Sequence, residues 1–243
     1  MDEKKEQNFV EMTLGDHLEE LRLRIIFALL GIGVGLAICL FYAGFFLSLL
    51  AKPYLEQAGS AATLQAITLS EKFFVYMKTA LLFGIILSSP WVFYQLWKFV
   101  SAGLYKNEKK FIYIIAPVCA LLFIIGALFF LFVMAPVMIK FFIDFDPGIK
   151  SIKTQVTLSS YIDFMLVMML IFGACFQLPV AIVAANRIGI LPVETLKKAR
   201  RYVLLAIFII AAIVTPTTDV VTQTALAVPM YILYELGILF CRR

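Results

Sequence analysis

The segment from Ile25 to Ala51 reads IIFALLGIGVGLAICLFYAGFFLSLLA and contains no Asp, Glu, Lys or Arg. About 20 apolar residues are enough for a helix to cross the roughly 30 Å of hydrocarbon in a bilayer. This segment exceeds that length, and further charge-poor stretches follow it along the chain. It therefore predicts a transmembrane helix rather than the core helix of a soluble domain.

The composition of the whole chain supports this interpretation. Among 243 residues, 63% are hydrophobic and 15% are charged, and the mean hydropathy is +0.97. Soluble domains have an apolar share of about 45–50%. An N-terminal signal alone cannot explain the difference, because apolar stretches recur to the end of the chain. We predict an all-α integral membrane protein that forms a single polytopic domain over residues 1–243.

Six stretches with few or no charges are candidates for transmembrane helices. Four are long, whereas the last two are shorter and form a hairpin around Pro216, the final one interrupted by Glu235. Prolines within or beside the stretches predict kinked helices, because each removes a backbone donor. The predicted spans are residues 25–51, 73–98, 111–139, 159–186, 202–216 and 220–240.

The 21 Lys and Arg residues predict the orientation of this bundle. If residues 1–24 form a cytoplasmic segment, most of the Lys and Arg residues lie on the cytoplasmic side. This is the distribution that the positive-inside rule describes, so we predict a cytoplasmic N-terminus. Six spans then also place the C-terminus in the cytoplasm. The net charge of +5 reflects this asymmetry, so we do not expect nucleic acid as a partner. On the other side, residues 52–72 and 140–160 are long enough to form caps.

Residues that could carry catalysis or bind metal are sparse. The single histidine, His17, cannot by itself form a zinc site or a catalytic triad. The cysteines have no paired spacing, and three lie in apolar stretches, which predicts neither a disulfide framework nor a metal site. They are Cys39, Cys119, Cys175 and Cys241. We therefore expect a protein without enzymatic activity and without a cofactor.

Residues 13–24 precede the first span and have the pattern of an amphipathic helix. Thr13 and Asp16 have the spacing of a capping box, so the helix is predicted to start here. Asp16, Glu19 and Glu20 form an acidic patch close to the membrane surface. This patch is either an ordinary solvated face or a binding surface for a basic ligand.

Two features inside the spans also suggest specific contacts. Gly31 and Gly35 have the small-xxx-small spacing that permits close packing of helices in membranes. Gln177 is a polar residue in an otherwise apolar span, so it should have a partner or face a wet cavity. It could make a structural hydrogen bond between helices, or it could receive a polar residue of a partner span.

The sequence HLEELRLR at residues 17–24 resembles the His-Leu-x-Glu-Leu-Arg-x-Arg signature of TatC, the multispanning subunit of the twin-arginine protein translocase. Further blocks resemble the family in the same order, so the resemblance covers nearly the whole chain. These blocks are residues 87–110, 172–180, 215–223 and 232–237.

The resemblance implies a receptor and assembly platform in the cell (inner) membrane that exports folded proteins with the proton-motive force. The implied partners are twin-arginine signal peptides, single-span subunits of the TatA and TatB type, membrane lipid and further copies of the chain. The implied signal-peptide site comprises Glu20, Glu108, Leu18, Arg22 and Lys106. Its logic is that guanidinium groups pair bidentately with carboxylates. The implied partner-span site comprises Gln177 and Pro179, although the family often has Glu at position 177.

A small-molecule or ion transporter is the alternative, because such proteins also have many spans and several prolines. A transporter would require paired ionisable groups near the middle of the membrane, and the long spans offer none. Co-purification distinguishes the two functions. A translocase subunit should retain signal-peptide fusions and small single-span partners, and a transporter should not.

Overall fold

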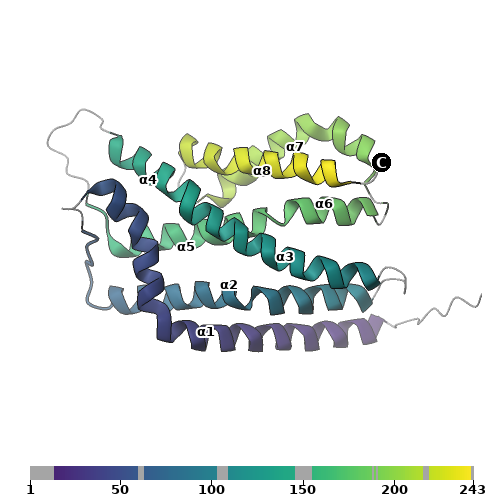
Figure 1. Ribbon diagram of the computed structural model, residues 1–243, viewed down its shortest axis with the longest axis horizontal. Helices are drawn as coiled ribbons and strands as arrows, with labels where there is room; N and C mark the ends of the chain where they lie inside the picture. Colours follow the sequence, from purple (N-terminus) through teal and green to yellow (C-terminus); the bar gives the residue numbers. More distant parts are fainter. Residues whose placement is uncertain are drawn as a thin grey trace, which may run out of the picture.

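The computed structural model describes residues 14–59, 63–102, 109–145, 155–187, 189, 191–215 and 219–241. Every regular element in this part of the chain is a helix, which confirms the predicted all-α fold (Figure 1). In order, these are α1 (Leu14–Ala58), α2 (Glu71–Ala102), α3 (Lys109–Phe129), the π-helical turn η1 (Phe130–Met134), α4 (Ala135–Asp144), α5 (Leu158–Cys175), α6 (Leu178–Arg187), α7 (Val193–Val214) and α8 (Val220–Phe240).

The helices run between the two ends of a bundle (Figure 1). Helix α1 begins, α2 ends and α3 begins at one end, which we call the N-terminal end. Helix α1 ends, α2 begins, α4 ends and α5 begins at the opposite end, which we call the cap end. The predicted sequence of alternating spans requires this arrangement.

Helix α1 is longer than the predicted span of residues 25–51. It begins at Leu14, so the amphipathic segment continues into the span without a break, and it ends at Ala58. Its final part, which includes Pro53, turns away from α2 and crosses the cap end (Figure 1). There the Tyr161 hydroxyl donates a hydrogen bond of 2.7 Å to the Leu50 carbonyl, which ties α5 to α1.

Polar contacts close the cap end. The Leu158 amide donates to the Gln65 carbonyl at 2.8 Å, and the Gln65 amide donates to the Val156 carbonyl at 3.2 Å. The buried Glu71 carboxylate accepts from the Ser159 amide at 2.7 Å and from the Ile67 amide at 2.6 Å. The described parts of the two long connections therefore form a cap, as their lengths predict.

Glycines allow the helices to cross closely. A Cβ atom added at Gly35 would lie 2.6 Å from the Gly84 carbonyl oxygen, so α1 and α2 pack backbone to backbone. A Cβ added at Gly126 would lie 2.6 Å from the Phe172 carbonyl oxygen, and α3 packs on α5 in the same way. The indole of Trp91 covers Gly31. The close packing predicted for Gly31 and Gly35 is therefore confirmed, and α2 is the partner.

Two prolines divide helices that the charge pattern predicts as continuous. Pro136 lacks an amide hydrogen, and just before it the chain forms the π-helical turn, in which the Ala135 amide bonds to the Phe130 carbonyl. Pro179 likewise cannot bond to the Cys175 carbonyl, and α5 ends at Cys175. The predicted span 159–186 is thus two helices, and Gln177 lies in the turn between them.

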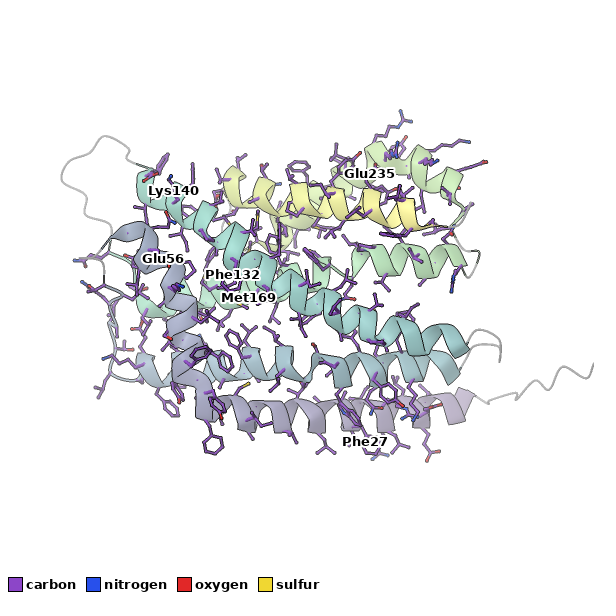
Figure 2. All side chains as sticks on the ribbon, viewed as in Figure 1. Phe27, Glu56, Phe132, Lys140, Met169 and Glu235 are labelled. Atoms are coloured by element: carbon purple, nitrogen blue, oxygen red, sulfur yellow. The ribbon has the colours of Figure 1, made fainter. Side chains whose placement is uncertain are left out.

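The centre of the bundle is filled by side chains from all the long helices. Met165, Met168 and Met169 of α5 are almost fully buried there with Phe130 and Phe172. Figure 2 labels Met169 in this central position. Methionine suits such a position because its flexible side chain fills irregular gaps between helices.

Helices α7 and α8 form the predicted final hairpin. They have 22 and 21 residues, compared with 45 in α1 and 32 in α2. Helix α7 starts with a charged segment, so its apolar part is restricted to residues 202–214. Within the described residues, five helical stretches are long and apolar enough to cross a membrane, and α8 is among them but α7 is not. Asp219 caps α8 by accepting from the Thr222 amide at 2.8 Å.

Candidate receptor site at the N-terminal end

Glu20 lies on α1 at the N-terminal end and is paired with Arg24, one helical turn further along. The Arg24 guanidinium donates to a Glu20 carboxylate oxygen at 3.1 Å. The two side chains are 22% and 20% exposed, so the pair is accessible without lying fully in solvent. A partly buried pair of this kind is stronger than a surface pair, because less water screens it.

A second hydrogen bond fixes this pair to α2. The other terminal nitrogen of Arg24 donates to the Gln95 side-chain carbonyl at 3.3 Å, and Gln95 is buried. The Arg24 Nε is buried and has no partner among the described residues. Arg24 therefore positions Glu20 relative to α2 while part of its own hydrogen-bonding capacity is unused.

Of the other residues predicted for the signal-peptide site, two lie in the described part of the chain and two lie outside it. Leu18 is 65% exposed and Arg22 is exposed, both beside Glu20 on α1. Glu108 and Lys106 lie outside the described residues. The ends of α2 and α3 that flank them are at the N-terminal end, the same end as Glu20 (Figure 1).

An apolar groove between α1 and α2 begins one turn beyond Arg24. Its volume is about 420 Å³, and Phe27, whose place on α1 is labelled in Figure 2, lies at its start. The Trp91 indole forms one wall and donates a hydrogen bond of 2.9 Å to the Phe27 carbonyl. The lining residues are Phe27, Leu30, Gly31, Val34, Gly35, Ile38, Leu87, Ser88 and Trp91. The polar Glu20–Arg24 pair is thus followed by an apolar surface along the same helix.

Gln177 is held by a hydrogen bond to another helix. Its amide nitrogen donates to the Cys119 carbonyl of α3 at 3.0 Å, while its carbonyl oxygen is buried without a partner among the described residues. Trp97 of α2 donates to the Cys119 sulfur at 3.1 Å. Pro179, two residues later, is buried and packs close to Gly237 of α8. Gln177 therefore makes the structural bond that the sequence allows, and keeps one acceptor unused.

Charged residues in the last hairpin are also paired. Arg200 of α7 donates to the Glu235 carboxylate of α8 at 2.7 Å, and the Tyr231 hydroxyl donates to the same carboxylate at 3.2 Å. Figure 2 labels Glu235 where these helices lie together. Glu235, the acidic residue that interrupts the sixth predicted span, is therefore paired with a basic residue of α7.

Several polar contacts between helices were not anticipated from the sequence, and two of them join α2 to a neighbouring helix. One is the hydrogen bond between Arg24 and Gln95, and the other is an ion pair between Lys78 of α2 and Asp163 of α5. Lys78 and Asp163 each directly precede a charge-free stretch in spans that start at the same end. That pattern could have placed them at one level, but the adjacency of α2 and α5 could not be read from it.

Known proteins resemble this chain over most of its length. The sequence model of the family described as "Sec-independent protein translocase protein (TatC)" matches residues 16–229. The TatC protein of Desulforapulum autotrophicum is 37% identical over 93% of this chain and 83% of its own length. The TatC protein of Escherichia coli K12 is 34% identical over 93% of this chain and 86% of its own length.

A solved structure gives the same relationship in three dimensions. A crystal structure of the twin arginine translocase receptor TatC matches with a TM-score of 0.80 and 31% identity, covering 92% of this chain and 96% of that one. The family match, the identities and the shared arrangement of helices extend over nearly the whole chain. This chain belongs to the TatC family of Sec-independent protein translocase proteins.

Proposed function

We propose that this chain is the signal-peptide receptor and core subunit of a twin-arginine translocase, which exports folded proteins with the proton-motive force. The observation that carries the proposal is Glu20, a partly exposed carboxylate at the N-terminal end that already binds a guanidinium. A carboxylate in this position can bind an arginine of a signal peptide through charge-assisted hydrogen bonds. Glu108, in the connection at the same end, supplies the second carboxylate.

The internal pair suggests how the first arginine is bound. Glu20 uses one oxygen for Arg24 at 3.1 Å, and its other oxygen accepts no hydrogen bond from the described residues. An incoming guanidinium can use that oxygen first and then replace Arg24, which remains bonded to Gln95. Lysine would not make the same bidentate contact, because its ammonium is a point charge without a planar fork.

The apolar groove supports the proposal independently of the charges. Signal peptides carry an apolar segment after their basic residues. A peptide whose arginine binds at Glu20 has the groove next along α1, beginning at Phe27 one turn beyond Arg24. Burial of apolar side chains there adds affinity that the two carboxylates do not supply.

The proposed receptor site also sets the orientation of the protein. Signal peptides are synthesised in the cytoplasm, so the N-terminal end faces the cytoplasm and the cap end faces outward. Both termini are then cytoplasmic, in agreement with the positive-inside distribution of basic residues. The protein is a multi-pass protein of the cell (inner) membrane. The small-molecule or ion transporter is not favoured by the family relationship.

Site-specific crosslinking tests the receptor function. A photoreactive residue placed within positions 13–24 or 104–110 should crosslink to a twin-arginine precursor and should lose the crosslink when both precursor arginines become lysine. Leu55, an exposed residue near the cap end of α1, is the matched control position. Equal crosslinking of the arginine and lysine precursors, or equal crosslinking from Leu55, would reject the proposal.

Gln177 and Pro179 are proposed as the docking position for a single-span partner subunit. The Gln177 carbonyl oxygen is the unused acceptor, and an unpaired amide oxygen in an apolar environment is costly. A polar side chain from a partner span can fill it. The regular helix is interrupted between α5 and α6 directly beside Gln177, and a partner span that reaches the buried oxygen displaces the side chains that cover it.

Replacing Gln177 tests the docking position. Gln177→Leu should preserve folding and precursor binding but weaken co-purification of the partner span, because the leucine cannot accept a hydrogen bond. Gln177→Glu should still assemble, since the carboxylate retains an acceptor for the partner span, although it loses the donor to the Cys119 carbonyl. Gln223→Leu, which removes a bond from α8 to the Phe208 carbonyl, serves as the control for loss of an interhelical bond. Normal assembly and export by Gln177→Leu would leave Gln177 with a structural role alone.

A further inference from the structure

The ion pair between Lys78 and Asp163 lies apart from the receptor site and has no role in the function proposed above. The Lys78 ammonium donates to both oxygens of the Asp163 carboxylate, at 2.8 and 2.9 Å. The Ser159 hydroxyl donates to the same carboxylate at 3.3 Å. The pair joins α2 to α5 near the cap end, where both helices begin.

The sequence that follows each residue indicates how deep in the membrane the ion pair lies. Residues 79–97 and 164–186, which follow Lys78 and Asp163, contain no Asp, Glu, Lys or Arg. Charge-free stretches of about 20 residues match the hydrocarbon thickness of a bilayer. Both charges therefore stand at the cap-end boundary of these charge-free stretches, within the first two turns of α2 and α5, and we place them at the level of the phospholipid headgroups.

The pair is accessible at that level. The Lys78 and Asp163 side chains are 47% and 43% exposed, although they form a double hydrogen bond. An ammonium has three donors, and two of them are directed at Asp163. The carboxylate accepts the lysine and Ser159 and has lone pairs left over. One donor and at least one acceptor consequently remain for a ligand on the surface of the bundle.

Apolar surface continues from the pair into the membrane. Leu81 and Val167 lie about one helical turn beyond Lys78 and Asp163 on the same faces of α2 and α5, and they are exposed. A ligand with a polar head at the ion pair can thus lay an acyl chain against these residues. This combination fits a phospholipid better than a water-soluble ion.

The two charges also select among phospholipids. A phosphate oxygen complements Lys78, and a primary ammonium with its own N–H donors complements Asp163. A headgroup with only a negative charge meets repulsion from the carboxylate, and a quaternary ammonium has no N–H to donate. We propose that Lys78 and Asp163 form a binding site for the phosphoethanolamine headgroup of a phospholipid at the cap end.

Native mass spectrometry of the purified protein with equal amounts of phosphatidylethanolamine, phosphatidylglycerol and phosphatidylcholine tests this site. The unchanged protein should retain phosphatidylethanolamine with roughly tenfold preference, which corresponds to about one charge-assisted hydrogen bond. Asp163→Asn leaves the Lys78 charge unopposed, so the preference should move to phosphatidylglycerol. Lys78→Gln should reduce retention of phosphatidylethanolamine to the level of phosphatidylcholine.

Lys52→Gln is the matched control, because it breaks an ion pair with Glu56 that lies within α1. It should leave lipid selectivity unchanged, and size-exclusion chromatography establishes that each variant is folded. Equal retention of the three lipids by the unchanged protein would overturn the site. So would selectivity that is the same in Asp163→Asn, Lys78→Gln and Lys52→Gln. Precursor binding is measured separately, so failure here leaves the receptor function untouched.

Discussion

Changing both Glu20 and Glu108 to glutamine should nearly abolish binding of a twin-arginine precursor. Each change removes one carboxylate partner of a guanidinium, and a hydrogen bond to a charged group contributes about 1.5–3 kcal/mol. The single variants should therefore bind roughly 10- to 150-fold more weakly, and the double variant should lose the product of the two effects if the sites act independently. Binding of purified precursor to the protein in detergent or nanodiscs measures this.

The structure makes the control for this experiment clear. Glu19 is exposed and adjacent to Glu20, but it makes no ion pair within the described residues. Glu19→Gln should therefore bind precursor as the unchanged protein does. Glu20→Gln also removes the charged partner of Arg24, which keeps its hydrogen bond to Gln95, so thermal unfolding must be compared in parallel. Unchanged affinity in both single variants and in the double variant would remove the two glutamates from the site.

Gly35→Leu should strongly destabilise the bundle. The added Cβ would lie 2.6 Å from the Gly84 carbonyl oxygen. The Cβ is fixed to the backbone of α1, and the oxygen is part of the backbone of α2. No side-chain rotation can relieve that contact, so the helices must separate. Overpacking of this kind costs up to about 3 kcal/mol and occasionally more. The loss should appear as a lower midpoint of thermal unfolding in detergent and as aggregation on size-exclusion chromatography.

Gly33→Leu is the matched control, two residues earlier on the same helix. A Cβ at Gly33 meets nothing within 4 Å, and the residue is exposed. The same substitution should therefore leave the unfolding midpoint nearly unchanged. If Gly35→Leu and Gly33→Leu unfold at the same temperature, the close approach of α1 and α2 at Gly84 is wrong.

The sequence by itself determined the class of this protein and most of its helices. Long stretches without charge, such as residues 25–51, can be stable only as helices in a bilayer, because a helix satisfies its own backbone hydrogen bonds. The Glu-Leu-Arg signature around Glu20 pointed to the family, and the spacing of Gly31 and Gly35 pointed to a close helix contact. All of these are local patterns in the chain.

The tertiary structure decided which residues meet. The sequence could not show that α2 covers Gly35, that Gln95 holds Arg24, or that Asp163 pairs with Lys78, because these contacts join residues far apart in the chain. Nor did the charge pattern reveal the break at Gln177, since the loss of one backbone bond at Pro179 can produce either a kink or a full turn. In the structure the segment around this turn packs against α3 and α8, and there the Gln177 side chain donates a hydrogen bond to the Cys119 carbonyl. Local patterns specify helices, whereas partners depend on how several helices fill the same space.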